Sequence, residues 1–349
     1  MSASPSSNPA DHAPPISSDH VESGQPEEYI SMTQFRKSMQ LVRLQIAIPI
    51  SVLVSLGTAM VCTLAIHPGV KEISDQHPTL LTPNDTMTGA YWFVVYFLQI
   101  GFCLVLICAR SDATKATLIH GVGMRYAIAN WLIALAVALW TLQLFRSCAL
   151  VVIVNTLNVI SIHITLTKYP PSLKHPFDAI FIHGGVALLT AMLFELTWLH
   201  VGSVAMGWVI ESKKHWAHYR WESTIAIAVV NVITAIWEAA TNQHILPLAS
   251  EYVALCLLLS SPRINPSMPD SGLPKPASEV ITLICCLVLH PLAVVASYGI
   301  RRQRNQEGRI RLEEEVEEAE ARAQQAQERA AAARRRAQQA GVDTDNGHH

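Results

Sequence analysis

Long runs of apolar residues alternate with short polar segments along most of this chain. A helix needs about 20 mainly apolar residues to cross the hydrocarbon core of a bilayer. By this measure the pattern predicts an all-α, polytopic transmembrane helix bundle of about eight spans. They lie near residues 44–66, 88–109, 121–144, 148–166, 177–208, 223–239, 246–261 and 278–300. The sixth and seventh runs are short, and one re-entrant hairpin is the alternative for them.

Composition supports the membrane class. Half of the residues are hydrophobic and only 15% are charged, whereas soluble domains carry about 25% charged residues. The net charge of −2 gives no reason to expect a nucleic-acid partner. All seven cysteines lie in apolar stretches and none has metal-ligand spacing, so we expect no metal and no cofactor.

The two ends of the chain differ from the bundle, which we place at residues 44–300. Residues 1–43 are predicted to be a disordered tail, since residues 1–28 are rich in Ser, Pro and acidic groups. Residues 301–341 form a charged, alanine-rich segment with small residues at 4-3 spacing, followed by a short tail at 342–349. Two interpretations stay open for it: a single solvated helix, or a weak coiled coil that joins copies or a protein partner through 306–340.

Lys and Arg near the predicted spans set the expected orientation. With the first segment in the cytosol, twelve of them lie on the cytosolic side and seven outside. We therefore expect both termini in the cytosol, in an endomembrane such as the ER or in the plasma membrane. The first external loop then contains Asn84-Asp85-Thr86, a glycosylation sequon at Asn84.

The fifth run, 177–208, carries the most ionisable groups: Asp178, His183, Glu195 and His200. A carboxylate at membrane depth costs roughly 2.5–3.5 kcal/mol on translocon scales, so it normally faces protein or a water-filled cavity. We expect this run at the centre of the bundle. The expected partners of Glu195 are His183, Arg125, Asn155 and Asn158.

Four further polar residues are candidates for a bundle site. Glu238 shares a helix face with Thr224, Asn231 and Thr234. The others are Asn130, Asn155 and Asn158, amides that either bond helices together or contact a substrate. For the glutamates the functional hypothesis is a proton or cation relay, and the alternative is a hydrogen bond across the bundle. Haem ligation by His163, His183, His200 or His290 has only loose support from their spacing.

Several stretches are similar to an uncharacterised fungal family of multi-pass membrane proteins, a domain of unknown function. They are YWFVVYFLQIG, GVGMRYAIANWLIALAVALW, LVVIVNTLNVI with KYP, and FIHGGVALLTAMLFELTW, and the resemblance covers roughly residues 40–300. Its most specific pieces are Tyr91-Trp92, Leu98-Gln99-Ile100-Gly101, Asn130, and Asn155 with Asn158. The resemblance implies a fold and a fungal origin, and no activity or site residue.

Three functions from different classes remain. The first is a small-solute or ion carrier that uses buried carboxylates, and the second is a scaffold that presents its C-terminal helix. The third, a lipid-acting membrane enzyme, is disfavoured because no GxSxG, HExxH or P-loop pattern is present. A polar cavity that reaches Glu195 favours the carrier, whereas a sealed bundle favours the scaffold.

Overall fold

The computed structural model describes residues 32–171, 176–241, 245–261, 274–306 and 322–325. The chain divides into two units, 1–40 and 41–349. The described part of the first unit, 32–40, is the beginning of helix α1 (Met32–Met60). It is therefore helical where we expected the end of a disordered tail, because the helix of the first span extends beyond its apolar run. Most of 301–341, with the expected coiled coil, lies outside the described residues.

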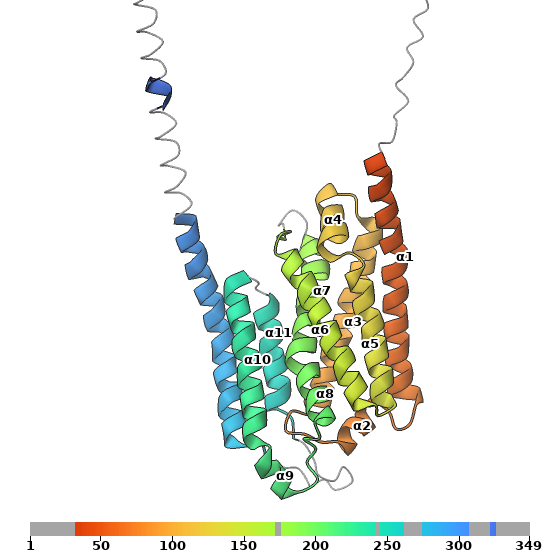
Figure 1. The fold of residues 1–349 in the computed structure, drawn as a ribbon, viewed down its shortest axis with the longest axis vertical. Helices are drawn as coiled ribbons and strands as arrows, with labels where there is room; N and C mark the ends of the chain where they lie inside the picture. The colour runs from red at the N-terminus through yellow and green to blue at the C-terminus, as the bar shows by residue number, and fades with distance from the viewer. Residues whose placement is uncertain (1–31, 172–175, 242–244, 262–273, 307–321, 326–349) are drawn as a thin grey trace, which may run out of the picture. The chain divides into compact units, whose positions relative to one another are not determined.

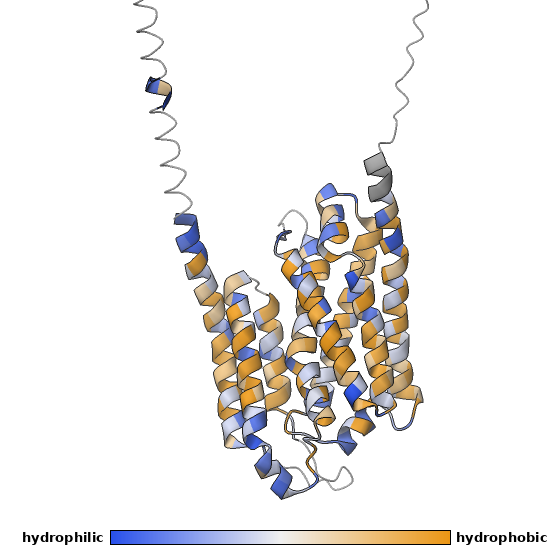
Figure 2. Ribbon diagram, in the orientation of Figure 1, coloured by the Kyte–Doolittle hydropathy of each residue, from blue (hydrophilic) through white to orange (hydrophobic). Residues whose placement is uncertain are grey.

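The predicted polytopic helical bundle is confirmed (Figure 1). Among the described residues, six helices are long and apolar enough to cross a membrane. They are Ser38–Ala65, Asp85–Cys108 (α3), Phe145–Leu166 (α6), Asp178–Ala205, Arg220–Thr241 (α10) and Ala277–Gln306. Hydrophobic residues cover these helices, while the short helix α9 (Lys213–His218) is hydrophilic (Figure 2). Exposed apolar side chains such as Leu53 and Phe93 suit contact with lipid.

The predicted third span is bent. Helix α4 (Asp112–Ala116) continues into the π-helical η2 (Thr117–Val122), and α5 (Arg125–Thr141) follows at 50°. The break is at Gly123, whose φ of 60° is a backbone conformation that glycine adopts at little cost. Counted as one span, this pair brings the number of long spans to seven.

The predicted seventh span is the short helix α11 (Ile245–Leu258). Its 14 residues reach about 21 Å, less than the roughly 30 Å of a hydrocarbon core. It packs against α7 (Gly185–Ala191), and its end is tied to the first loop, since the Asn84 N–H donates to the Cys256 carbonyl. Most of its residues are buried, although Leu248 is 69% exposed, so a short helix suffices to return the chain to that end of the bundle.

Loops from distant parts of the sequence meet at this end. The Ile210 N–H donates to the Pro78 carbonyl at 2.7 Å, and Lys275 Nζ donates to the Leu80 carbonyl at 2.9 Å. The short helix α2 (Val70–Gln76) belongs to the same region and packs against α5. Among the described residues, the six long helices, the bent pair counted as one span and the short α11 together make eight apolar helical segments.

Asp178–Ala205 is the central helix of the bundle. Of its apolar window 72% is buried, against at most 44% in the other five long helices. It consists of η3 (Asp178–Gly184), α7, η4 (Met192–Thr197) and α8 (Trp198–Ala205), so one π-helical segment begins it and a second interrupts it. Such segments are frequent at functional sites. Helix α6 packs against both α5 and α8, which completes the core around it.

Candidate functional site

Glu195 lies on η4 and faces α11, with only 1% of its surface exposed. Ser250 Oγ donates a hydrogen bond of 2.6 Å to Glu195 Oε1. The second oxygen, Oε2, has no hydrogen-bond partner among the described residues. The Thr234 side chain of α10 approaches the same carboxyl group, while its own hydroxyl donates to the Val230 carbonyl. Glu195 is therefore a buried acid held from one side by a neutral donor.

Glu238 and His290 form a second buried contact beside it. His290 Nδ1 lies 2.8 Å from Glu238 Oε2, and neither side chain is exposed. His290 Nε2 lies 3.1 Å from Asn231 Oδ1. Helix α10 supplies Glu238 and Asn231, and the helix Ala277–Gln306 supplies His290. The name acid cluster is used below for Glu195, Ser250, Glu238, His290 and Asn231.

The expected partners of Glu195 lie elsewhere. Arg125 donates to the Ser161 carbonyl and to Thr165 Oγ1, which keeps it on the surface between α5 and α6. Asn155 donates to the Ala129 carbonyl at 3.1 Å, and Asn158 donates to the Arg125 carbonyl at 2.9 Å. Both bonds run from α6 to α5. The partner expectation is wrong for these three residues, because the two asparagines bond to α5 and Arg125, which lies on α5, bonds to α6.

Two other candidates also lie outside the acid cluster. The Asn130 amide donates to the Tyr126 carbonyl of its own helix at 3.1 Å. His183 is buried on η3 and forms no hydrogen bond with either carboxylate among the described residues. Its neighbour His163 accepts a hydrogen bond of 3.0 Å from Trp237 Nε1. The structure thus brings Glu195 and Glu238 together and leaves His183 and the three asparagines apart from them.

A cavity of about 410 Å³ lies at the end of the bundle that α2 covers. Its walls come from α1, α2, α3, α5, α6 and the second half of the central helix, and they are mainly apolar or aromatic. Among the lining residues are Trp92, Tyr96, Ile133, Trp140, Val152 and Met192. Small-molecule sites typically measure about 300–1,000 Å³ and are mostly apolar with few polar groups. Glu195 is not on this lining, although its neighbours Leu196 and Thr197 are.

Polar groups gather at one end of this cavity. Ser74 of α2 and His200 of α8 both line it, and Ser74 Oγ lies 3.1 Å from His200 Nε2. The His200 ring packs against Trp140, with ring centroids 5.3 Å apart. Lys71 also lines the cavity, and its ammonium group contacts Asp85 at 2.5 Å and Asp75 at 3.0 Å. The charge of the lysine is therefore already balanced.

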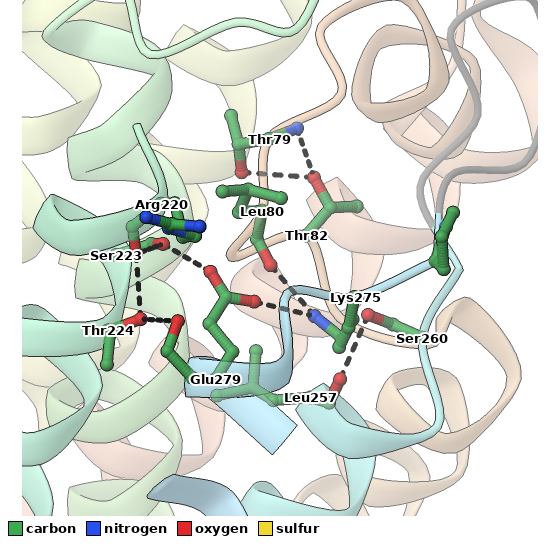
Figure 3. Close-up of polar contacts among 12 residues, drawn as sticks. Thr79, Leu80, Thr82, Arg220, Ser223, Thr224, Leu257, Ser260, Lys275 and Glu279 are labelled. Atoms are coloured by element: carbon green, nitrogen blue, oxygen red, sulfur yellow. Dashed lines mark hydrogen bonds and ion pairs between the residues drawn. The ribbon is translucent and has the colours of Figure 1, made fainter. Parts of the chain in front are cut away.

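A buried ion pair lies beside the first loop, at the start of the last helix (Figure 3). Lys275 Nζ lies 3.7 Å from Glu279 Oε2 and donates to the Leu80 carbonyl. Ser223 of α10 donates to the other oxygen of Glu279, and Thr224 contacts Ser278. Burial lowers the pKa of Lys275 below its ordinary value, which Glu279 opposes. The arrangement ties the start of the last helix to α10 and to the first loop.

The sequence patterns did not identify Ser250, Ser74, Lys275 or Glu279. Serines in apolar helices are common, and nothing in their spacing marks those that face a carboxylate or a cavity. His290 was considered only as a haem ligand. Its position opposite Glu238 depends on how the last helix is rotated against α10, which spacing along one helix does not fix.

In the part of the chain that the structure describes, no three His, Cys, Asp or Glu side chains are placed to hold a metal ion. The seven cysteines are free thiols.

The family comparison covers most of the bundle. The sequence model of the TSPO-like protein family matches residues 44–254, well over half of the chain. The chain belongs to the TSPO-like protein family. This confirms the expectation of a multi-pass membrane protein in contact with the lipid bilayer. A fungal origin and the orientation of the termini in this TSPO-like protein stay predictions.

No curated protein and no solved structure matches the TSPO-like chain. The family match includes Glu195, Glu238, Asn231 and Ser250 and ends at residue 254. The last helix, with His290, lies beyond it. The acid cluster thus joins the matched region to a segment outside the match.

Proposed function

We propose that this TSPO-like protein binds a small, uncharged amphipathic molecule in the cavity under α2, as a carrier of such molecules does. The observation that supports this most is the cavity itself, since its volume of about 410 Å³ and its apolar walls suit a small-molecule site. The Ser74–His200 pair offers a hydroxyl and an imidazole to one polar group of the ligand. Because Lys71 is paired with two aspartates, its charge does not require an anionic ligand in the cavity.

The ion-carrier hypothesis has less support from the cavity. A polar cavity that reaches Glu195 would favour a small-solute or ion carrier that uses buried carboxylates, but Glu195 is almost fully buried and is not on the lining of the cavity. A lipid-acting enzyme is also less favoured. Ser74 and His200 have the contact of a nucleophile and a base, yet His200 Nδ1 has no partner among the described residues to orient it. The scaffold hypothesis concerns 306–340, almost all of which lies outside the described residues.

Binding is testable with a matched pair of probes. We expect purified protein in detergent to bind tritiated dodecanol in a scintillation-proximity assay, and to bind dodecane less tightly because it lacks the hydroxyl. Ser74→Ala removes one hydrogen-bonding group, worth about 0.5–1.5 kcal/mol, and should weaken dodecanol binding roughly 2- to 12-fold. Dodecane binding should not change in this variant. Equal binding of the two probes to the wild type would contradict a polar recognition group.

Two glycines provide the control for the place of binding. A Cβ at Gly89 or at Gly57 meets no atom within 4 Å, but only Gly89 lines the cavity. Gly89→Leu should fill part of the cavity and reduce dodecanol binding, whereas Gly57→Leu should leave it at the wild-type level. If Gly89→Leu binds dodecanol as the wild type does, the probe occupies another site and the proposal fails.

A further inference from the structure

Three titratable side chains meet in the interior of the bundle, each from a different helix. Glu195, Glu238 and His290 are 1%, 1% and 0% exposed. The cavity proposed for ligand binding does not use them, since none is on its lining. A charge at membrane depth is costly unless an opposite charge or hydrogen bonds compensate it. The stability of this arrangement therefore depends on the net charge of the three side chains, which is set by the number of protons bound to them.

Hydrogen bonds fix the state of the His290 ring. The Asn231 amide nitrogen donates to the Ile227 carbonyl at 2.8 Å, so its oxygen Oδ1 is the atom that faces His290. An amide oxygen only accepts, which means that His290 Nε2 carries a hydrogen. The contact of 2.8 Å between His290 Nδ1 and Glu238 Oε2 then contains one more proton, which is bound either to Nδ1 or to Oε2. His290 and Glu238 together are therefore neutral.

Glu195 has no such basic partner in its hydrogen bonds. Its Oε1 accepts from Ser250 Oγ at 2.6 Å, and its Oε2 lacks a partner within the described residues. With His290 already shared with Glu238, an ionised Glu195 leaves one uncompensated negative charge inside the bundle. A proton on Glu195 removes that charge. The Thr234 oxygen, whose hydrogen is directed to the Val230 carbonyl, remains available to accept from this proton.

We propose that the acid cluster is a membrane-embedded proton-binding site in which Glu195 holds the exchangeable proton and the Glu238–His290 pair remains neutral. The ligand of this site is a proton. Glu195 releases it as H⁺ and becomes a carboxylate that retains the Ser250 hydrogen bond. Three further titratable side chains lie near the cluster on neighbouring helices: Tyr91 of α3, Glu251 of α11 and Cys286 of the last helix, and a fourth, Cys256 of α11, lies near Tyr91.

None of these four neighbours supplies a positive charge. The Tyr91 hydroxyl donates to the Leu188 carbonyl at 2.8 Å, so it gives no hydrogen to Glu195. Glu251 is a third acid, and the two cysteines are neutral or negative. The surroundings therefore favour the protonated form of Glu195 still further. Because His290 lies beyond the matched region 44–254, the proton site depends on a helix outside that match.

Infrared spectroscopy tests this assignment without any knowledge of the activity. A protonated carboxylic acid has a carbonyl stretching band that is separate from the bands of a carboxylate. In the wild-type protein in lipid nanodiscs at neutral pH, we expect a band of this kind that shifts in D₂O and disappears in Glu195→Gln. Glu195→Asp keeps the acid group and should shift the band instead of removing it. This variant decides the matter if Glu195→Gln does not fold.

The control is Glu251→Gln, which removes a neighbouring acid that is outside the hydrogen bonds of the cluster. It should leave the carbonyl band in place. Loss of only carboxylate bands in Glu195→Gln, together with an unshifted spectrum in Glu195→Asp, would show that Glu195 is ionised and overturn the proposal. If Glu238→Gln removes the band and Glu195→Gln does not, the proton resides on Glu238 and the assignment is wrong.

Discussion

Lys275 and Glu279 form an ion pair from which water is almost excluded. Their charged atoms lie 3.7 Å apart, and their side chains are 4% and 0% exposed. Lys71 is different: it contacts two carboxylates, and its side chain is 62% exposed. The Lys275–Glu279 pair connects the start of the last helix to the first loop, whereas Lys71 and Asp85 line the cavity. The two lysines should therefore respond differently to the same substitution.

Lys275→Met should destabilise the protein strongly. It leaves the Glu279 carboxylate buried without its cation, and breaking a buried pair in this way costs about 3–5 kcal/mol. The double change Lys275→Met with Glu279→Leu removes both charges and should recover most of the loss. Melting in detergent, followed by size-exclusion chromatography, measures this. Lys71→Met is the control and should melt close to the wild type, and an equal loss in both single variants would argue against the role of burial.

Gly101→Ala should destabilise the contact between α3 and η3. A Cβ at Gly101 overlaps the Phe181 ring, which packs near Phe97. Overpacking of this kind typically costs about 1–3 kcal/mol. Adding Phe181→Leu to Gly101→Ala should restore part of the melting temperature. Gly57→Ala, where the new Cβ has open space, serves as the control and should be neutral.

The Lys71 contacts predict a small loss of stability at alkaline pH. The hydrogen bond to Asp85 raises the pKa of Lys71 above its ordinary 10.5, against the opposing effect of partial burial. A raised pKa gives a contribution that is complete below pH 10.5 and is lost as the pH rises through the higher value. For so exposed a pair it should stay below about 1 kcal/mol. Lys71→Gln should flatten this part of the melting profile.

Eight passes predict that both ends of the chain lie on one side of the membrane. The excess of Lys and Arg assigns that side to the cytosol. On sealed vesicles of cytosolic-side-out orientation, protease should remove epitope tags at both termini and spare a tag inserted in 262–273. A protected C-terminal tag beside a cleaved N-terminal tag would mean that α11 does not carry the chain across.

Asn84 should remain unglycosylated in the folded protein, although its sequon is intact. Its side chain is the N-cap of α3, where Oδ1 accepts from the Met87 N–H and Nδ2 donates to the Leu259 carbonyl. A glycan on Nδ2 has to compete with this contact at the membrane surface. Asn84→Ala should therefore change stability by about 1 kcal/mol, through the cap, and leave gel mobility unchanged. A glycosidase-sensitive shift in the wild type would contradict this.

The sequence alone determined the helical class, the approximate places of the long apolar helices and the central place of 177–208, but not the bend at Gly123 or the shortness of α11. In lipid a backbone must satisfy its own hydrogen bonds, so long apolar runs can only be helices. The cost of a charge at membrane depth likewise requires Glu195 to face protein. Both conclusions follow from local composition, and neither needs to know which helices are neighbours.

Only the tertiary structure decided which groups meet. Ser250 lies 55 residues from Glu195, and His290 lies 52 residues from Glu238. These pairings depend on how each helix is rotated and on which helix it packs against, and the polarity of single residues does not fix either. The cavity under α2 likewise depends on tertiary packing, since residues of several different helices form its walls. Sequence pattern thus indicated that Glu195 needs a partner, and packing selected Ser250.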